Sequence, residues 1–171
     1  PAGVLLLARN LQADASYEEW LSALGNLLSE TKKNAEREHM LITLDHEGGR
    51  VMRTPPPITR FDAAAQFRHR ASEVAAAMAV ELASLGVNVS WAPVADIHSN
   101  PANPIIGQRA FGTTVDEVIE AAVPFLTTLQ GKGIACCAKH FPGHGDTSTD
   151  SHLELPVVRL TEVELREREL K

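Results

Sequence analysis

Four short apolar runs divide the chain, and each has the length of a buried β-strand. They are Gly3–Ala8, Met40–Leu44, Val87–Ala92 and Ile134–Ala138. Their apolar residues are mostly consecutive rather than alternating, as is typical of parallel strands. Stretches with helical periodicity follow the runs. We therefore predict four strand-then-helix units, forming a parallel sheet with helices on its outer face.

Helix starts are indicated by three Ser/Thr residues that each precede a glutamate by three positions, the spacing of a capping box. These pairs are Ser16 with Glu19, Thr114 with Glu117, and Thr161 with Glu164. After the first pair, apolar residues recur at helical spacing from Trp20 to Leu28. The last pair predicts the first turns of a helix close to the end of the sequence.

Two further features shape the middle helices. An apolar stripe from Val74 to Leu85 predicts a helix that Gly86 closes. The helix after Thr114 is predicted to reach about Lys132, with Pro124 kinking it or shifting its start. Neither feature changes the α/β pattern.

Polar residues lie at or just beyond the predicted strand ends, namely Asp45, Asp96, Lys139 and His140. In α/β barrels, catalytic groups occupy the carboxyl ends of the strands. A closed eight-stranded barrel takes about 250 residues, and this chain has 171. The fold class that we predict is therefore α/β, with parallel βα repeats forming about half of a TIM (β/α)8 barrel.

Composition narrows the function classes. The chain is 44% hydrophobic and 22% charged, with a formal charge of −6 and a pI near 5.6, which argues against nucleic acid as a partner. The chain has no run of 18 apolar residues, so no membrane span is predicted. We expect a cytoplasmic protein, with secretion as the alternative because Pro1 is not an initiator residue. Cys136 and Cys137 are adjacent in a predicted strand, and we interpret both as packing thiols.

The segment from Ile134 to Pro156 is the densest in titratable groups. Within fourteen positions it carries one lysine, three histidines and two aspartates: Lys139, His140, His144, Asp146, Asp150 and His152. Such a loop beyond a strand is suited to catalysis. A zinc site made of these histidines and aspartates is an alternative, although the spacing matches no H-E-x-x-H helix.

This loop resembles the signature of family 3 glycoside hydrolases, closest to their β-N-acetylglucosaminidase branch, which includes enzymes of bacterial cell-wall (peptidoglycan) recycling. The similar segments are Asp45–Val51 with Arg53, Trp91–Asp96, Ile106–Arg109, Lys139–Thr147, and Asp150–His152 with Leu155–Pro156. They occur in the family's order and cover nearly the whole chain. The resemblance implies a (β/α)8 barrel, of which residues 1–171 would be one partial N-terminal domain holding the second to fifth βα units.

The resemblance also implies roles for particular residues. Five are expected to contact the hydroxyls of N-acetylglucosamine: Asp45, Arg53, Arg109, Lys139 and His140. Asp150 and His152 are expected to form the acid/base dyad of a retaining reaction, whose nucleophilic aspartate follows a later strand that has no match in this chain. The expected substrate is a terminal β-linked N-acetylglucosamine, with no cofactor and no metal.

Several alternatives stay open at this point. The strand-end residues have structural alternatives, such as ion pairing or capping of backbone amides. Asp96 and His144 are expected to hold loops, and Asp146 is interpreted either as a structural residue or as a support for residues that touch the substrate. Trp20 and Trp91 are interpreted as core residues, with stacking against a sugar as the alternative, chiefly for Trp91 because it lies near a strand end. Phosphorolysis is a second enzymatic hypothesis, because a histidine repels phosphate less than a carboxylate does. A non-catalytic sugar-binding or assembly module, pairing with itself or with a missing barrel half, is a third.

Overall fold

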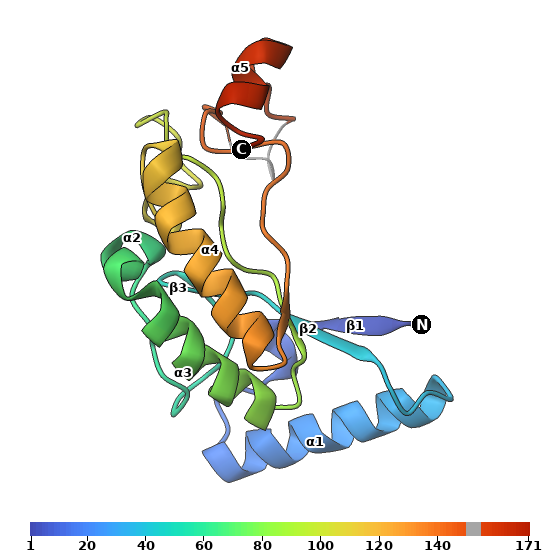
Figure 1. The fold of residues 1–171 in the computed structure, drawn as a ribbon. Coiled ribbons are helices and arrows are strands. Elements are labelled where there is room, and N and C mark those ends of the chain that lie inside the picture. The colour runs from blue at the N-terminus through green and yellow to red at the C-terminus, as the bar shows by residue number, and fades with distance from the viewer. Residues whose placement is uncertain (150–154) are drawn as a thin grey trace.

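The computed structural model describes residues 1–149 and 155–171, and a four-stranded parallel sheet lies at its centre (Figure 1). The order along the sheet, β1-β2-β5-β6, follows the order along the chain. The strands are β1 (Gly3–Leu6), β2 (Leu41–Leu44), β5 (Val89–Ser90) and β6 (Ala135–Cys136). All four predicted strands are present, and the α/β fold class is confirmed.

Each strand is shorter than its apolar run, and in β1, β5 and β6 the residues lost include those at the carboxyl end. Leu44 pairs with Ser90, and Ser90 pairs with Cys136, in regular register. Beyond these pairs only single contacts continue, such as the bridge between Val94 and Lys139. Beyond the strands, polar side chains such as that of Asp96 also accept hydrogen bonds from the backbone.

The helices also agree with the predicted starts. The longer ones are α1 (Tyr17–Asn34), α3 (Ala71–Ser84) and α4 (Val115–Gly131), and the shorter ones are α2 (Ala64–Phe67) and α5 (Glu162–Glu167). Three 3₁₀ turns accompany them: η1 (Ala8–Asn10), η2 (Arg68–Arg70) and η3 (Gly107–Arg109). The short α2 and the 3₁₀ turns were not predicted.

Two of the three predicted capping boxes form completely, those of Ser16 and Thr161. The third is only half formed. The Thr114 side chain accepts from the Glu117 amide, but the Glu117 carboxylate binds the Thr113 amide at 2.8 Å and Arg68 at 2.6 Å. Pro124 lies inside α4 and does not shift its start.

The hydrophobic core lies between the sheet and the helices on one of its faces. In Figure 1, α3 and α4 run side by side against the sheet, and α1 crosses below them. Phe67, Phe111 and Phe125 pack with ring centroids 5.7 to 6.0 Å apart. Trp20 is buried, as expected of a core residue, and its indole nitrogen donates to the Pro56 carbonyl at 3.2 Å.

The other face of the sheet is open. Leu5 is 49% exposed and Leu41 54% exposed, although both lie in strands. Cys136 is partly buried and directs its sulfur toward α4, whereas Cys137 points the opposite way and is exposed. The interpretation of both cysteines as packing thiols is therefore wrong for Cys137.

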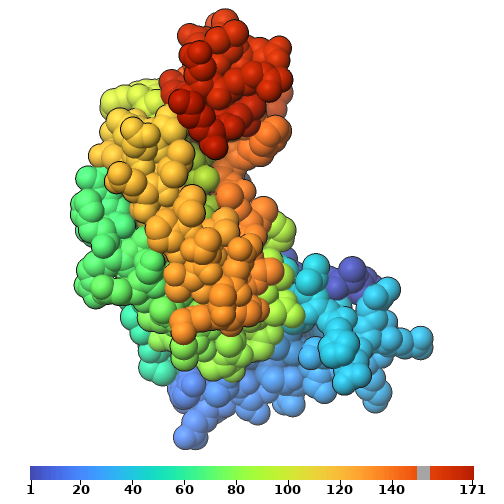
Figure 2. Space-filling view, viewed as in Figure 1, coloured from blue at the N-terminus to red at the C-terminus, as the bar shows by residue number. Residues whose placement is uncertain are grey.

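The space-filling view shows the carboxyl-terminal segment rising above the rest of the molecule (Figure 2).

Among the described residues, no helix combines the length and the apolar character needed to cross a membrane.

His46, in β3 (His46–Gly48), is a buried histidine without a hydrogen-bond partner in the described part of the chain. Its ring packs edge-on against Phe61. Burial, and secondly the positive charge of Arg60, lower its pKa to about 4. The folded protein therefore holds His46 neutral, whereas the unfolded chain protonates it below about pH 6.5.

We predict that this difference makes stability depend on pH. Because the folded pKa is depressed, the free energy of unfolding should fall as pH decreases from about 6.5 to about 4, by about 2–3 kcal/mol from this group. Urea denaturation at pH 7 and pH 4.5 measures the effect. His46→Leu should reduce the pH dependence, while His39→Leu, at an exposed position, should not. Identical pH dependence in His46→Leu and the unmodified chain would contradict the prediction.

Candidate active site

The polar residues predicted at the strand ends come together at one edge of the sheet. The Lys139 ammonium, beyond β6, donates to Asp45 Oδ1, beyond β2, at 2.8 Å. Parallel strands end at the same edge, so residues 94 positions apart become neighbours. Asp45 is also 3.7 Å from Arg53, through its Oδ2 atom.

A hairpin of β3 and β4 (Val51–Met52) follows β2 and was not predicted. Its turn uses Gly48 at φ 98° and Gly49 at φ 56°, values that favour glycine. A side chain at Gly48 would also overlap the Asp62 carbonyl oxygen. The hairpin returns the chain so that Arg53 faces Asp45.

Glu47, in β3, is the central residue of the site that sequence reasoning missed. Its carboxylate binds Arg109 twice, at Nε (2.8 Å) and Nη2 (2.9 Å), and Lys139 at 2.5 Å. The Glu47 side chain is only 3% exposed. The available signal was an acidic residue in a strand-end motif, but its partners lie far along the chain.

Arg109, in η3, is held in one orientation. Besides Glu47, its Nη1 donates to the Ile105 carbonyl at 3.2 Å. Burial alone would lower the pKa of Arg109, but the hydrogen bonds and charge of Glu47, with the charges of Asp96 and Asp45, raise it above the usual value. Arg109 is therefore a permanent cation.

Asp96 organises the loop that follows β6. Its Oδ2 lies 2.6 Å from His140 Nδ1, and its Oδ1 accepts from the backbone amides of His140 (3.1 Å) and His144 (2.7 Å). The Asp96 side chain is fully buried. The carboxylate favours a proton on His140 Nδ1, which leaves Nε2, 3.5 Å from Arg109 Nη2, to face the site. Asp96 thus holds the loop, as expected.

A second set of contacts fixes the same loop from the side of residues 99–103. Buried Asn103 donates from Nδ2 to the carbonyls of His144 and Thr147, both at 2.8 Å. His144 Nδ1 lies 2.6 Å from the Thr147 hydroxyl, so His144 also holds the loop. Asp146 binds Ser99 at 2.9 Å and Arg168 at 3.1 Å, which agrees with a structural role.

The five residues expected to contact sugar thus form one connected group through Glu47 and Asp96. A hollow of about 150 Å³ lies beside two of them, Lys139 and His140, and its lining also includes Asp96, Gly143 and Glu169. Within the described chain, no three His, Cys, Asp or Glu residues are arranged to hold a metal ion.

The two residues predicted to form the acid/base dyad lie outside the described part of the chain. They are Asp150 and His152.

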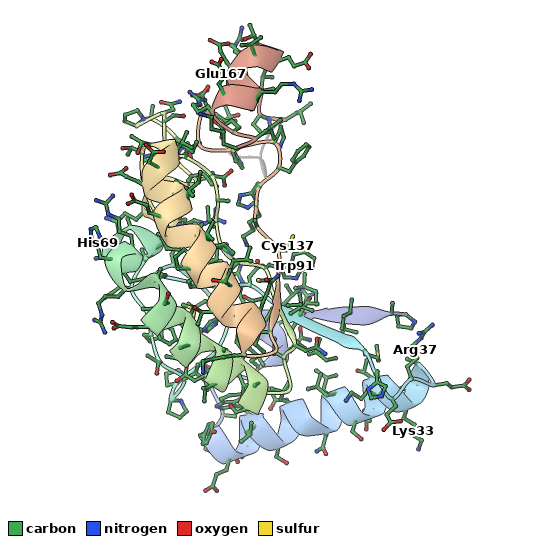
Figure 3. The ribbon with its side chains drawn as sticks, viewed as in Figure 1. Lys33, Arg37, His69, Trp91, Cys137 and Glu167 are labelled. Carbon is green, nitrogen blue, oxygen red and sulfur yellow. The ribbon has the colours of Figure 1, made fainter. Side chains whose placement is uncertain are left out.

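Trp91, interpreted as a core residue, is only partly buried, and Figure 3 shows it close to Cys137, beside the sheet.

Fold and site together define a class. They describe an α/β protein of βα units whose ionic site lies where parallel strands end, the arrangement of (β/α)8 barrels.

Comparison with known proteins identifies the family. The sequence model of the glycosyl hydrolase family 3 N-terminal domain matches residues 2–171. The beta-hexosaminidase of Methylococcus capsulatus is 41% identical, and the match covers 98% of this chain and 50% of that protein. The beta-hexosaminidase of Thioalkalivibrio sulfidiphilus is 37% identical, over 95% of this chain and 48% of its own length. The chain therefore belongs to glycosyl hydrolase family 3.

Solved structures agree with this assignment and with the predicted TIM-barrel-like fold. A family 3 β-N-acetylglucosaminidase from Paenibacillus sp. superimposes with a TM-score of 0.86 at 33% identity, over 99% of this chain and 32% of that chain. NagZ from Neisseria gonorrhoeae, in complex with N-trifluoroacetyl-D-glucosamine, gives 0.83 at 33% identity, over 99% of this chain and 51% of that chain. The chain spans about half the length of the curated relatives that it matches first.

We predict that Asp96 is essential for the stability of the loop. Asp96→Ala would leave two buried backbone amides and the His140 ring without their acceptor, so the free energy of unfolding should fall by about 2–4 kcal/mol. Asp116→Ala, at an exposed position in α4, is the matched control and should change it by less than about 0.5 kcal/mol. Equal stability of the two variants in urea denaturation would refute the assigned role.

Proposed function

We propose that the chain forms part of a glycoside hydrolase that cleaves terminal β-linked N-acetylglucosamine with retention of configuration. The observation that carries the proposal is the ionic group of Asp45, Arg109, Lys139 and His140 at the carboxyl ends of the strands. It is supported by the family assignment and by the glucosamine derivative bound to the Neisseria protein. Residues 1–171 would be one partial barrel domain.

The site offers suitable partners for sugar hydroxyls. Asp45 keeps a partly exposed carboxylate, and among the described residues its Oδ2 has only the 3.7 Å contact with Arg53. A carboxylate can accept hydrogen bonds from two adjacent hydroxyls, and Lys139 and Arg109 can donate to hydroxyl oxygens. His140 Nε2 adds a group that accepts when the ring is neutral. Together with Arg53, these residues would orient the ring.

The proposed chemistry uses two groups. His152, with its tautomer set by Asp150, would protonate the bridging oxygen while a nucleophilic aspartate forms a covalent bond to the anomeric carbon. The bond between that carbon and the bridging oxygen breaks in the same step, and the aglycone leaves as an alcohol. His152 would then accept a proton from water as water displaces the enzyme carboxylate. An unperturbed histidine pKa near 6.5 suits both steps at neutral pH. No segment of this chain matches the nucleophile's motif, so the chain would supply the acid/base part.

The open face of the sheet favours assembly as a second candidate function. Leu5 and Leu41 are about half exposed there, and Cys137 lies on the same face. Such a face, bordered by strand edges, is suited to pairing with further strands. A non-catalytic module that binds sugar and awaits a barrel partner would have this surface.

The first prediction concerns turnover. Assayed with an aryl N-acetylglucosaminide, the 171-residue chain should show weak or no release of the aryl group, because it lacks a matched nucleophile. Parallel assays with and without phosphate separate hydrolysis from phosphorolysis. Robust turnover that persists in His152→Ala would contradict both the dyad and the missing nucleophile.

The second prediction concerns binding. N-acetylglucosamine should perturb the NMR signals of residues around Lys139, and Asp45→Asn should raise the Kd at least tenfold, because the amide donates where the carboxylate accepts from hydroxyls. Asp14→Asn, at an exposed position, is the control and should bind as the unmodified chain does. Unchanged affinity in Asp45→Asn would remove Asp45 from the site.

A further inference from the structure

Glu47 carries three charge-assisted contacts and almost no exposed surface. Oε2 accepts from Arg109 Nε, while Oε1 accepts from Arg109 Nη2 and from Lys139 Nζ. Both oxygens are therefore occupied by the protein. Three of the roughly four acceptor positions of the carboxylate are filled, and its burial keeps a ligand from reaching the remaining one.

Asp45 provides the contrast. Its side chain is 24% exposed, and within the described part of the chain only its Oδ1 makes a short contact, with Lys139. Asp45 and Glu47 both contact Lys139, but they differ in exposure and position. Asp45 faces the site, and Glu47 lies behind it.

We propose that Glu47 is the positioning residue of the sugar-binding group, acting on the ligand only through Arg109 and Lys139. The proposal rests on the proposed function and assigns its site a residue that does not itself touch the sugar. A guanidinium held in a two-point contact has its plane fixed, and fewer conformations must be lost when a ligand binds.

The loop that carries Arg109 is tied to the same hairpin by a second cation. Arg50, in the turn between β3 and β4, donates to the Ile105 carbonyl, and Arg109 Nη1 donates to that same oxygen. Asn103 Oδ1 accepts from the Ile105 and Ile106 amides at 2.9 and 2.7 Å. The backbone beneath Arg109 is therefore fixed independently of Glu47, and what Glu47 adds is the orientation of the side chain.

Charge explains why a carboxylate is needed. Arg109 and Lys139 approach the same oxygen atom of Glu47, so the two cations converge on one point. A neutral amide of the same shape would present an N–H group to at least one of them. Glu47→Gln should therefore release Arg109 or Lys139 from its position, even though the volume of the side chain is conserved.

The test has two readouts in the full 171-residue chain. The first needs no ligand: the Arg109 Nε–H signal in ¹⁵N NMR spectra should be resolved and slow to exchange, and Glu47→Gln should abolish it. The second is the Kd for N-acetylglucosamine, which Glu47→Gln should raise at least tenfold. In an Arg109→Met background, Glu47→Gln should weaken binding much less, because its main route is already removed.

Two further variants complete the design. Glu47→Asp keeps the charge but is one methylene too short to reach both cations, so its Kd should lie between those of the unmodified chain and Glu47→Gln. Glu73→Gln removes a surface glutamate paired with Arg70 at 2.8 Å, and should leave both readouts unchanged. If Glu47→Gln does not fold, Glu47→Asp alone supplies both readouts.

The outcomes separate the two proposals. A chain that does not bind N-acetylglucosamine would overturn the proposed function, while the Arg109 signal would still decide whether Glu47 positions that side chain. Binding that is unaffected by Glu47→Gln would overturn the positioning role and leave the proposed function standing. Full additivity with Arg109→Met would show that Glu47 does not act through Arg109, and would overturn the proposal as well.

Discussion

The buried carboxylate of Glu47, between two cations, is the interaction on which the arrangement of the loops at the carboxyl ends of the strands depends. An ionised group inside a protein is tolerated only when partners replace its water, and removing one partner is costly. Glu47 satisfies that condition with Arg109 and Lys139, which come from separate loops. The hairpin, the loop before α4 and the end of β6 must therefore close together, because each delivers one member of the group.

This requirement accounts for the irregular ends of the strands. Beyond Ser90 and Cys136 the backbone pairing is reduced to isolated bonds, such as that from the Ala95 amide to the Lys139 carbonyl at 2.7 Å, and side chains supply further partners for the backbone. Asp96 accepts two amides of the loop after β6, and Asn103 bridges that loop to the preceding segment. The polar side chains thus supplement the sparse pairing at the strand ends, and the same side chains build the site.

The sequence predicted those features that depend on local patterns. Ser16 and Thr161 form their capping boxes because both partners lie within one turn of helix. The Thr114 box stayed half formed because one oxygen of the Glu117 carboxylate binds the Thr113 amide and the other binds the distant Arg68, which no local rule reveals. Glu47 was missed for the same reason, since its importance arises from residues 62 and 92 positions away. The hairpin was missed because β4 has only two residues. The roles of Asp150 and His152 stay predictions.

The balance of charge indicates what kind of ligand this edge of the sheet suits. Among the described residues, three cations, Arg53, Arg109 and Lys139, face three carboxylates, those of Asp45, Glu47 and Asp96. Glu47 and Asp96 are buried behind the site, while the side chains of Asp45 and of the three cations remain partly exposed. An anion such as phosphate gains most from an excess of positive charge, and here every cation already has a carboxylate neighbour. A neutral ligand rich in hydroxyls gains instead from fixed donors beside fixed acceptors, and it loses little on leaving water for such a surface. The arrangement therefore suits a neutral, hydroxyl-rich ligand better than an anion at this position.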